Sequence, residues 1–405
     1  MFTSSGLVWG LLSVIAMFIM AAVIAVWLFQ SQILLLPNAT GQRIGAIDGL
    51  RGYLAIAVLA HHFPIAYRWA SNGQWQTSGL TLFDNLGPVA VSCFFMITGL
   101  LFYKRFIVAE IKPAWMQFFA NRFFRVAPVY YLAVMVTVFV VIATTGWLFA
   151  NRDNTISILS WLLFTIHGPL PLNGFPAKVV TAGVFWTLRY EWAFYFSLPV
   201  LVLLFKPLRG RAALRLAVLA FGFITMSLLP FDVYGFQTSI VRAFLIGMIT
   251  AEILESKLCY KYANNNIVSS FAVGAILSAI FLPLPAYGTI SLLLIFVFFL
   301  ASACGCTMFG LLSLRSSILL GEISYSIYAL HGIVLFGFVF TSSSRLDPTE
   351  PWVWLALPSL ASIVVMMSAI TYRFVEQPGI KLGRRGPFSA QGTKVVHGSQ
   401  APQIE

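Results

Sequence analysis

Charged side chains are scarce in this sequence: only 9% of its 405 residues are Asp, Glu, Lys or Arg, whereas 59% are hydrophobic. Residues 1–42 carry no charge at all. Because roughly a quarter of the residues in a soluble domain are charged, this composition excludes a soluble domain. The apolar runs are continuous over about 20 residues, as in spanning α-helices, and do not alternate like the short strands of a β-barrel. The sequence therefore predicts an all-α, polytopic membrane helix bundle.

Cysteine is also scarce. The sequence has four cysteines, which lie in or beside apolar runs and are not expected to form a disulfide framework: Cys93, Cys259, Cys304 and Cys306. Cys304 and Cys306 flank one glycine, but no second pair completes the ligand set of a soft metal, so we expect no metal. The net charge of +12 is interpreted loop by loop, as in other membrane proteins, and not as a surface for nucleic acid.

Eleven apolar runs are long enough to cross a bilayer. The shorter run 155–166 is expected to lie at the interface. We find no internal repeat, so an inverted-repeat transporter has no support from the sequence. The predicted spans are 7–29, 47–67, 86–107, 126–149, 180–205, 212–230, 237–254, 267–283, 287–305, 318–341 and 352–374.

The distribution of Lys and Arg between alternate loops predicts the orientation. Segments 104–125, 206–215, 255–261 and 373–394 hold most of the basic residues. The loops on the other side hold only Arg68, Arg152, Lys178 and Arg345. Because cytoplasmic loops are enriched in basic residues, the N-terminus is expected outside and the C-terminus inside.

Residues 46–67 form an apolar segment that carries four polar groups at membrane depth: Asp48, Arg51, His61 and His62. Ionisable groups are costly there and usually functional. On a helix Arg51 and His62 share one face within about 20° and lie about 16 Å apart along the axis, whereas His61 points about 80° away. Asp48 is one turn before Arg51, close enough to orient it. His61 is therefore expected to be a packing residue or to support the neighbouring functional groups.

Two later spans place ionisable groups at a similar depth. Measured from the cytoplasmic end, His62 is expected about 24 Å up, and Glu191 and His331 about 21 Å up. These three groups could share one buried polar chamber. Alternatively, Glu191 and Arg189 satisfy each other as bundle contacts, and His331 is a packed histidine.

A pair of arginines precedes the fourth span. Arg122 and Arg125, in NRFFRVAPVYY, are one turn apart at its cytoplasmic end. Paired arginines at a helix start suit a phosphate group, although ordinary anchoring at the cytoplasmic surface would also explain them.

His167, in an outer loop, is expected to have no functional role. Two classes fit these features: an enzyme that uses a phosphate-bearing cytoplasmic donor, and a transporter or proton relay. The arginines favour the enzyme, because a proton relay needs no phosphate clamp.

Motifs along 46–377 resemble those of the membrane acyltransferase-3 family. IDGLRG followed by His62 resembles its opening signature, and NRFFRVAPVYYL its Arg-x-x-Arg segment. Three further segments are similar in the same order: FWTLRYEWAFYFSLP, GEISYSIYALHG and YRFVEQPG. SCFFMITGLLFYKRF is similar too, with Thr98 where the family usually has Ser. A second departure is Glu322, in GEISYSIYALHG, where a basic residue is common. The resemblance divides the chain into an N-terminal helix and linker (1–42), the acyltransferase-3 membrane domain (43–377) and a disordered cytoplasmic tail (378–405).

The resemblance, which is to stand-alone members, implies transfer of an acyl group, usually acetyl, from acetyl-CoA to a sugar hydroxyl of a cell-envelope glycan such as O-antigen or exopolysaccharide. It implies a bacterial inner-membrane protein with a periplasmic N-terminus and no tightly bound cofactor. His62 and Glu191 would then be catalytic, as a general base with its orienting carboxylate or with His62 transiently acylated. Coenzyme A phosphates would meet Arg51, Arg122 and Arg125, supported by Asp48, Arg189 and His331. A glycan transporter without transferase activity is the alternative, and the sequence does not indicate an oligomeric state.

Overall fold

The computed structural model describes residues 4–35, 45–147, 151–166, 168–233, 236–256, 265–342 and 351–385. Within these ranges the chain is almost entirely helical, as the composition predicted. The described strands form one small sheet, in which β1 (Asp232–Val233) pairs antiparallel with β2 (Phe236–Gln237). Cys259, His167, Arg345 and residues 386–405 lie outside the described residues.

Six described helices are long and apolar enough to cross a membrane: α1 (Ser4–Gln30), α3 (Thr81–Tyr103), α4 (Trp115–Thr145), α6 (Trp186–Phe205), α12 (Ser324–Ser342) and α13 (Pro351–Thr371). Three shorter apolar helices are α7 (Ala212–Leu228), α9 (Asn266–Phe281) and α10 (Thr289–Ala303). The two remaining predicted spans coincide with α2 (Gly45–Asn72) and α8 (Thr238–Glu255). Every predicted span thus overlaps a helix, while the count of eleven crossings stays a prediction.

Two predicted spans differ from what their hydropathy suggests: one is interrupted, and the other begins later. The run 318–341 is divided at Ile323 into α11 (Arg315–Glu322) and α12. The run 180–205 becomes helical only at Trp186, because Ala182 and Gly183 adopt positive φ angles of 51° and 67° that a helix does not allow. Hydropathy detects neither change, because the residues involved are apolar or small.

Short elements complete the chain. The run 155–166, predicted at the interface, overlaps α5 (Arg152–Leu162), whose start is capped by the Asn151 side chain accepting from the Asn154 amide at 2.8 Å. A π-helical turn (Lys104–Val108) extends α3, and another (Tyr372–Glu376) follows α13. Short 3-10 turns lie at Ala177–Val179, Lys206–Leu208 and Leu311–Ser313.

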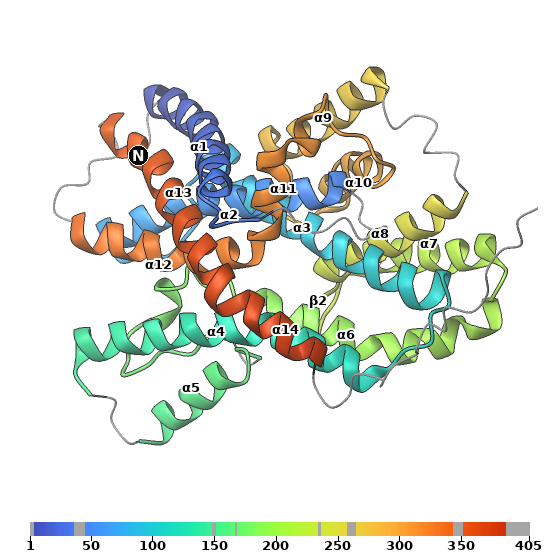
Figure 1. Cartoon of the computed structure of the whole chain (residues 1–405), viewed down its shortest axis with the longest axis horizontal. Helices are drawn as coiled ribbons and strands as arrows, with labels where there is room; N and C mark the ends of the chain where they lie inside the picture. Colours follow the sequence, from blue (N-terminus) through green and yellow to red (C-terminus); the bar gives the residue numbers. More distant parts are fainter. Residues whose placement is uncertain are drawn as a thin grey trace, which may run out of the picture.

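The beginning of the predicted disordered tail is helical. Residues 378–385 belong to α14 (Gln377–Arg385), which packs against α4. Gly379 lies against the Phe124 carbonyl and Pro128, and Gln117 donates to the Gly383 carbonyl at 2.7 Å. These contacts hold the helix to the bundle, where Figure 1 shows the red α13–α14 segment crossing from α1 to α4. Composition could not reveal them, because they depend on α4.

Helix α2 lies at the centre of the packing, in contact with α3, α11 and α12 (Figure 1). Three glycines bring its backbone close to its neighbours. A Cβ atom at Gly49 would lie 2.0 Å from the Leu312 carbonyl oxygen, and one at Gly52 would lie 2.5 Å from Leu320 Cβ. A Cβ at Gly321 of α11 would lie 1.8 Å from the Asp48 carbonyl oxygen. Small residues allow this close backbone approach, which is a common basis of helix packing in membranes.

We expect Gly49→Ala to destabilise the protein, because the added methyl group meets a backbone carbonyl that cannot move without shifting α11. Melting of the purified protein in detergent measures the effect. Gly274→Ala is the matched control: it lies inside α9, and an added Cβ has no neighbour within 4 Å. It should leave the melting temperature equal or higher, since Ala favours a helix by about 1 kcal/mol over Gly. Equal melting of the two variants would contradict the packing argument.

Membrane orientation can be tested with single cysteines in a cysteine-free background and a membrane-impermeant thiol reagent. Ser71 and Asp153 are exposed and expected outside, whereas Lys112 is exposed and expected inside. Asn154 is unsuitable because it is buried and bonded to Asn173. In intact cells or spheroplasts we expect labelling at 71 and 153 and none at 112 until the membrane is opened. Labelling at 112 alone would reverse the orientation.

Candidate functional site

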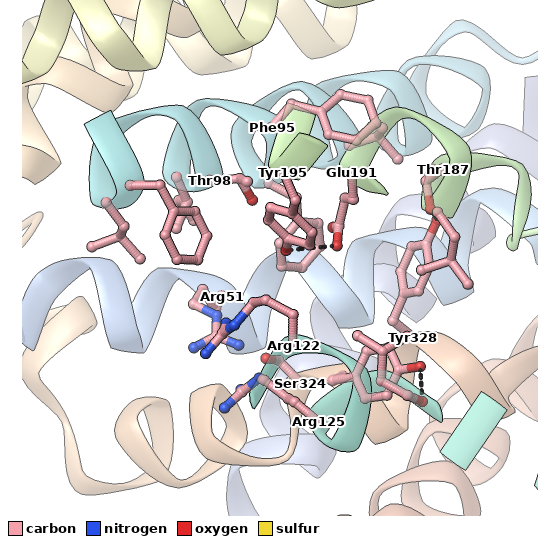
Figure 2. Close-up of a pocket in the computed structure, with 18 residues that line it drawn as sticks. Arg51, Phe95, Thr98, Arg122, Arg125, Thr187, Glu191, Tyr195, Ser324 and Tyr328 are labelled. Carbon is pink, nitrogen blue, oxygen red and sulfur yellow. Dashed lines mark hydrogen bonds between the residues drawn. The ribbon is translucent and has the colours of Figure 1, made fainter. Parts of the chain in front are cut away.

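A cavity of about 240 Å³ lies between α2, α3, α4, α6 and α12. Its walls are largely aromatic and aliphatic, and polar groups from all five helices converge on it (Figure 2). This combination of apolar walls and a few convergent polar groups is typical of a ligand-binding site. The polar and charged side chains that line it are Arg51, Thr98, Arg122, Arg125, Thr187, Glu191, Tyr195, Ser324, Tyr325 and Tyr328.

The three arginines predicted to bind phosphate all line this cavity, where Figure 2 shows them gathered together. Arg51 comes from α2 and is paired with Asp48 only at 4.0 Å. Arg125 comes from α4 and is likewise 4.0 Å from Glu376. Arg122, one turn earlier, lies over the Phe102 ring at 5.2 Å, and its Nε atom has no hydrogen-bond partner among the described residues. The cavity therefore concentrates positive charge that its own carboxylates neutralise only loosely.

Glu191 lines the same cavity from α6. Its carboxylate accepts a hydrogen bond from the Tyr195 hydroxyl at 3.2 Å, one helical turn further on, and Figure 2 shows this pair beside the arginines. The sequence left open whether Glu191 shares one polar chamber with His62 and His331. Among the described residues, Glu191 forms no hydrogen bond with either histidine. A similar position along their helices did not bring Glu191 into contact with the histidines, because that position does not determine the direction in which each side chain points.

His62 and His331 instead form a pair with each other. His62 Nδ1 lies 3.1 Å from His331 Nε2, and the two rings are 5.1 Å apart. His331 is fully buried, whereas His62 is partly exposed. The sequence predicted a similar depth for these two groups, and the structure shows them in contact. Neither lines the arginine cavity as it stands in this structure.

His61 faces another direction. Its Nδ1 lies 2.8 Å from the Phe83 carbonyl oxygen of α3, and its ring occupies the space beside Gly87, where a Cβ would come within 2.4 Å. His62 faces α12. The helical geometry of α2 thus separates the adjacent histidines as predicted, and His61 has the contacts of a packing residue.

Tyr328 lies between the arginine cavity and the histidine pair. Its ring lines the cavity and is 6.2 Å from the His331 ring. Its hydroxyl donates to the Val184 carbonyl at 3.0 Å and lies 3.1 Å from the Thr187 hydroxyl. Phe94, also a lining residue, packs edge-on against Tyr328 at 6.0 Å. The cavity and the histidines are therefore neighbours separated by aromatic rings.

A family model described as an acyltransferase domain, Acyl_transf_3, matches residues 44–372. The chain belongs to the acyltransferase-3 family. It is therefore a multi-pass membrane protein and an acyltransferase that transfers groups other than amino-acyl groups. The match begins one residue before α2 and ends within the turn that follows α13, so it includes every residue that lines the cavity.

Two curated relatives are similar over most of their length. Nodulation protein 10 of Rhizobium leguminosarum bv. viciae is 26% identical over 371 residues, which cover 85% of this chain and 95% of the relative. Exopolysaccharide production protein ExoZ of Rhizobium meliloti (strain 1021) is 27% identical over 253 residues, covering 61% of this chain and 76% of the relative. No solved structure matches this chain.

Two supporting residues of the acyltransferase have different surroundings. Asp48 lies beside Arg51, as its spacing of one turn predicted. Arg189 does not line the cavity, and its guanidinium lies 5.1 Å from the Tyr190 ring and 5.6 Å from the Phe236 ring. A neighbour two positions away on a helix points in nearly the opposite direction, so Arg189 cannot face the cavity when Glu191 does.

Glu376 is a site residue whose role the sequence did not reveal. It is fully buried, accepts from the Ser326 hydroxyl at 2.7 Å, and lies 4.0 Å from Arg125, which lines the cavity. It is the only acidic residue in the segment YRFVEQPG, at the end of an apolar run, and this position was an available signal. Its partners could not be inferred, because they belong to α4 and α12.

Within the described ranges, no group of three or more His, Cys, Asp or Glu side chains is placed to hold a metal ion. Cys304 and Cys306 are both buried, and Cys306 contacts the Ser269 hydroxyl at 3.1 Å. The cationic cavity and the histidine pair are thus the two features that offer chemistry.

Proposed function

We propose that the protein transfers an acyl group, acetyl in the simplest case, from cytoplasmic acyl-CoA to a sugar hydroxyl of a cell-envelope glycan. The observation that carries the donor is the cavity with Arg51, Arg122 and Arg125, whose charges are only loosely neutralised. Coenzyme A bears phosphate groups, which arginine binds through charge-assisted hydrogen bonds. The name of the relative ExoZ, an exopolysaccharide production protein, supports a glycan acceptor.

The buried Nε atom of Arg122 is the strongest sign that an anion completes this cavity. A buried nitrogen without a hydrogen-bond partner is uncommon in proteins, and a bound phosphate oxygen would supply the partner. Ser324 Oγ, which also lines the cavity, has no partner among the described residues either. Both groups can bind an anionic or polar ligand without first breaking an internal hydrogen bond.

We assign the chemical step to His62, which is partly exposed and lies next to the cavity beyond Tyr328. It acts either as general base on the sugar hydroxyl or as the group that is transiently acylated. Glu191 belongs to the donor side, because its carboxylate faces the arginines and Tyr195 and does not contact His62. There it helps to hold the guanidinium groups in place.

The orientation derived from the loop charges completes the proposal. It places the N-terminus outside and the C-terminus inside the bacterial inner membrane, so that Arg51 is near the cytoplasm and His62 is further outward. A glycan transporter would not cleave the thioester of acyl-CoA, whereas this acyltransferase would, so thioester cleavage by the purified protein distinguishes the two. The glycan fraction of cells with and without the intact gene should differ by the mass of one acyl group.

Arg122→Ala, and separately Arg51→Ala or Arg125→Ala, should weaken binding of coenzyme A about ten- to hundredfold, because each removes a charge-assisted phosphate contact of roughly 1.5–3 kcal/mol. Titration calorimetry with purified protein measures the affinity. Arg105→Ala removes the same charge from an exposed position outside the cavity and should have little effect. Unchanged affinity in all three cavity variants would contradict the donor site.

His62→Ala should abolish acyl transfer while the protein remains folded, since it removes the reacting imidazole. His61→Asn is the matched control, because its side-chain amide can still donate to the Phe83 carbonyl. It should retain most of the activity. The test measures transfer of labelled acyl groups from acyl-CoA to envelope glycan, with melting as the check on folding. An active His62 variant with an inactive His61 variant would refute the assignment.

A further inference from the structure

The two paired imidazoles each contact a backbone carbonyl oxygen as well as each other. His331 Nδ1 lies 3.2 Å from the Ile327 carbonyl, and His62 Nδ1 lies 3.0 Å from the Val58 carbonyl. The link between them joins His62 Nδ1 and His331 Nε2 at 3.1 Å. Among the described residues, neither ring has a carboxylate as hydrogen-bond partner. The positions of the protons follow from these three contacts.

The proton of His331 is fixed first. A carbonyl oxygen can only accept a hydrogen bond, so the ring nitrogen that faces Ile327 must carry a proton. A neutral imidazole has one N–H and one lone pair. His331 is fully buried in a membrane bundle, where the neutral form costs least. Its Nε2 atom, which faces His62, therefore presents a lone pair.

The proton of His62 follows. Its Nδ1 atom faces two acceptors, the Val58 carbonyl and the lone pair on His331 Nε2, so this nitrogen must carry the proton. With a lone pair on His62 Nδ1 instead, two acceptors would face it without a hydrogen atom between them. His62 Nε2 then holds the free lone pair, and it forms no hydrogen bond among the described residues.

We propose that His331 is the positioning residue of the acyltransferase: it holds His62 in the tautomer that leaves Nε2 as the reacting atom. This inference rests on the proposed function only for the identity of the reaction. The Val58 carbonyl alone would favour the same tautomer only weakly, because this oxygen already accepts a backbone hydrogen bond within α2. His331 adds a second acceptor from another helix and so fixes the orientation of the ring as well.

The reacting nitrogen can then take part in a balanced transfer. The sugar hydroxyl gives its proton to His62 Nε2 as its oxygen bonds to the acyl carbon of the thioester. The C–S bond breaks, and the coenzyme A thiolate takes the proton from Nε2. While His62 is protonated, its Nδ1–H bond to His331 becomes charge-assisted and therefore stronger. A neutral imidazole thus stabilises the cation without placing a permanent charge in the bundle.

Two aromatic rings are neighbours of the His62 ring. The Trp75 ring is stacked on His62 at 6.3 Å, and the His61 ring lies edge-on at 4.7 Å. Trp75 belongs to the segment between α2 and α3 and is only partly buried.

Nitrogen NMR of the full-length protein with ¹⁵N-labelled histidine tests the tautomer directly. The chain has only five histidines, and the His62 signals are assigned by their loss in a His62→Gln variant. In the wild type near neutral pH we expect His62 to carry its proton on Nδ1 and none on Nε2. In His331→Phe, which keeps a ring but removes the acceptor, we expect a mixture of tautomers. In the His61→Asn control, the His62 signals should match the wild type.

Kinetics provide the second readout. His331→Phe should lower kcat by about 100-fold, the lower end of the contribution of acid–base catalysis, with unchanged KM for acyl-CoA. His331→Gln should restore most of the activity, because its amide oxygen can accept the His62 proton at the place of Nε2. A merely structural role would predict the reverse order, since Phe preserves the packed ring better than Gln does.

Each outcome decides the proposal. A proton on Nε2 of His62 in the wild type would overturn it, whatever the variants do. Equal activity of His331→Phe and wild type would also overturn it. If His331→Phe does not fold, the wild-type spectrum and the His331→Gln variant still decide. If the wild type has the expected tautomer but transfers no acyl group, the proposed function fails and the tautomer assignment stands.

Discussion

The contact between α2 and α11 determines how the rest of the molecule is arranged around the site. Gly52 and Gly321 let the two backbones approach so closely that no side chain fits between them, and Gly49 does the same toward Leu312 in the turn before α11. This contact fixes the rotation of α2 about its axis. Once the rotation is fixed, Arg51 must face the cavity and His62 must face α12. The glycines of the IDGLRG motif therefore position the functional residues without contacting a substrate.

Two groups of buried charged residues near α3 differ in how well their charges are neutralised. On one side, Arg215 forms a bidentate pair with Glu252 at 2.6 and 2.9 Å, and Tyr103 donates to the same carboxylate at 2.7 Å. This cluster has its charges and hydrogen bonds largely satisfied and joins α7, α8 and α3. On the other side, the cavity arginines have carboxylates only at 4.0 Å or, for Arg122, none within that distance among the described residues. The first arrangement stabilises the bundle, whereas the second is arranged to receive a ligand.

The spatial relation between the arginine cavity and the histidine pair bears on how a reaction could pass through the bundle. An arginine cluster can hold the charged end of a long donor, while the reactive end needs a nucleophile or base further away. Tyr328 and Phe94 lie between these two places and are held by ring packing and by the bonds of the Tyr328 hydroxyl to Thr187 and Val184.

The sequence by itself determined the class of fold, the approximate position of most helices and the polar residues that lie within apolar segments. It could do so because hydropathy and helical spacing are local properties: Asp48 beside Arg51, and His61 turned away from His62, both follow from one helix. Only the tertiary structure decided which polar groups meet. Glu191 joined the arginines and His62 joined His331, because contacts between helices depend on the rotation of each helix about its axis. Arg125 on α4 and Glu376 after α13 are partners in the structure. They are more than 200 residues apart in the chain, and no local pattern connects them.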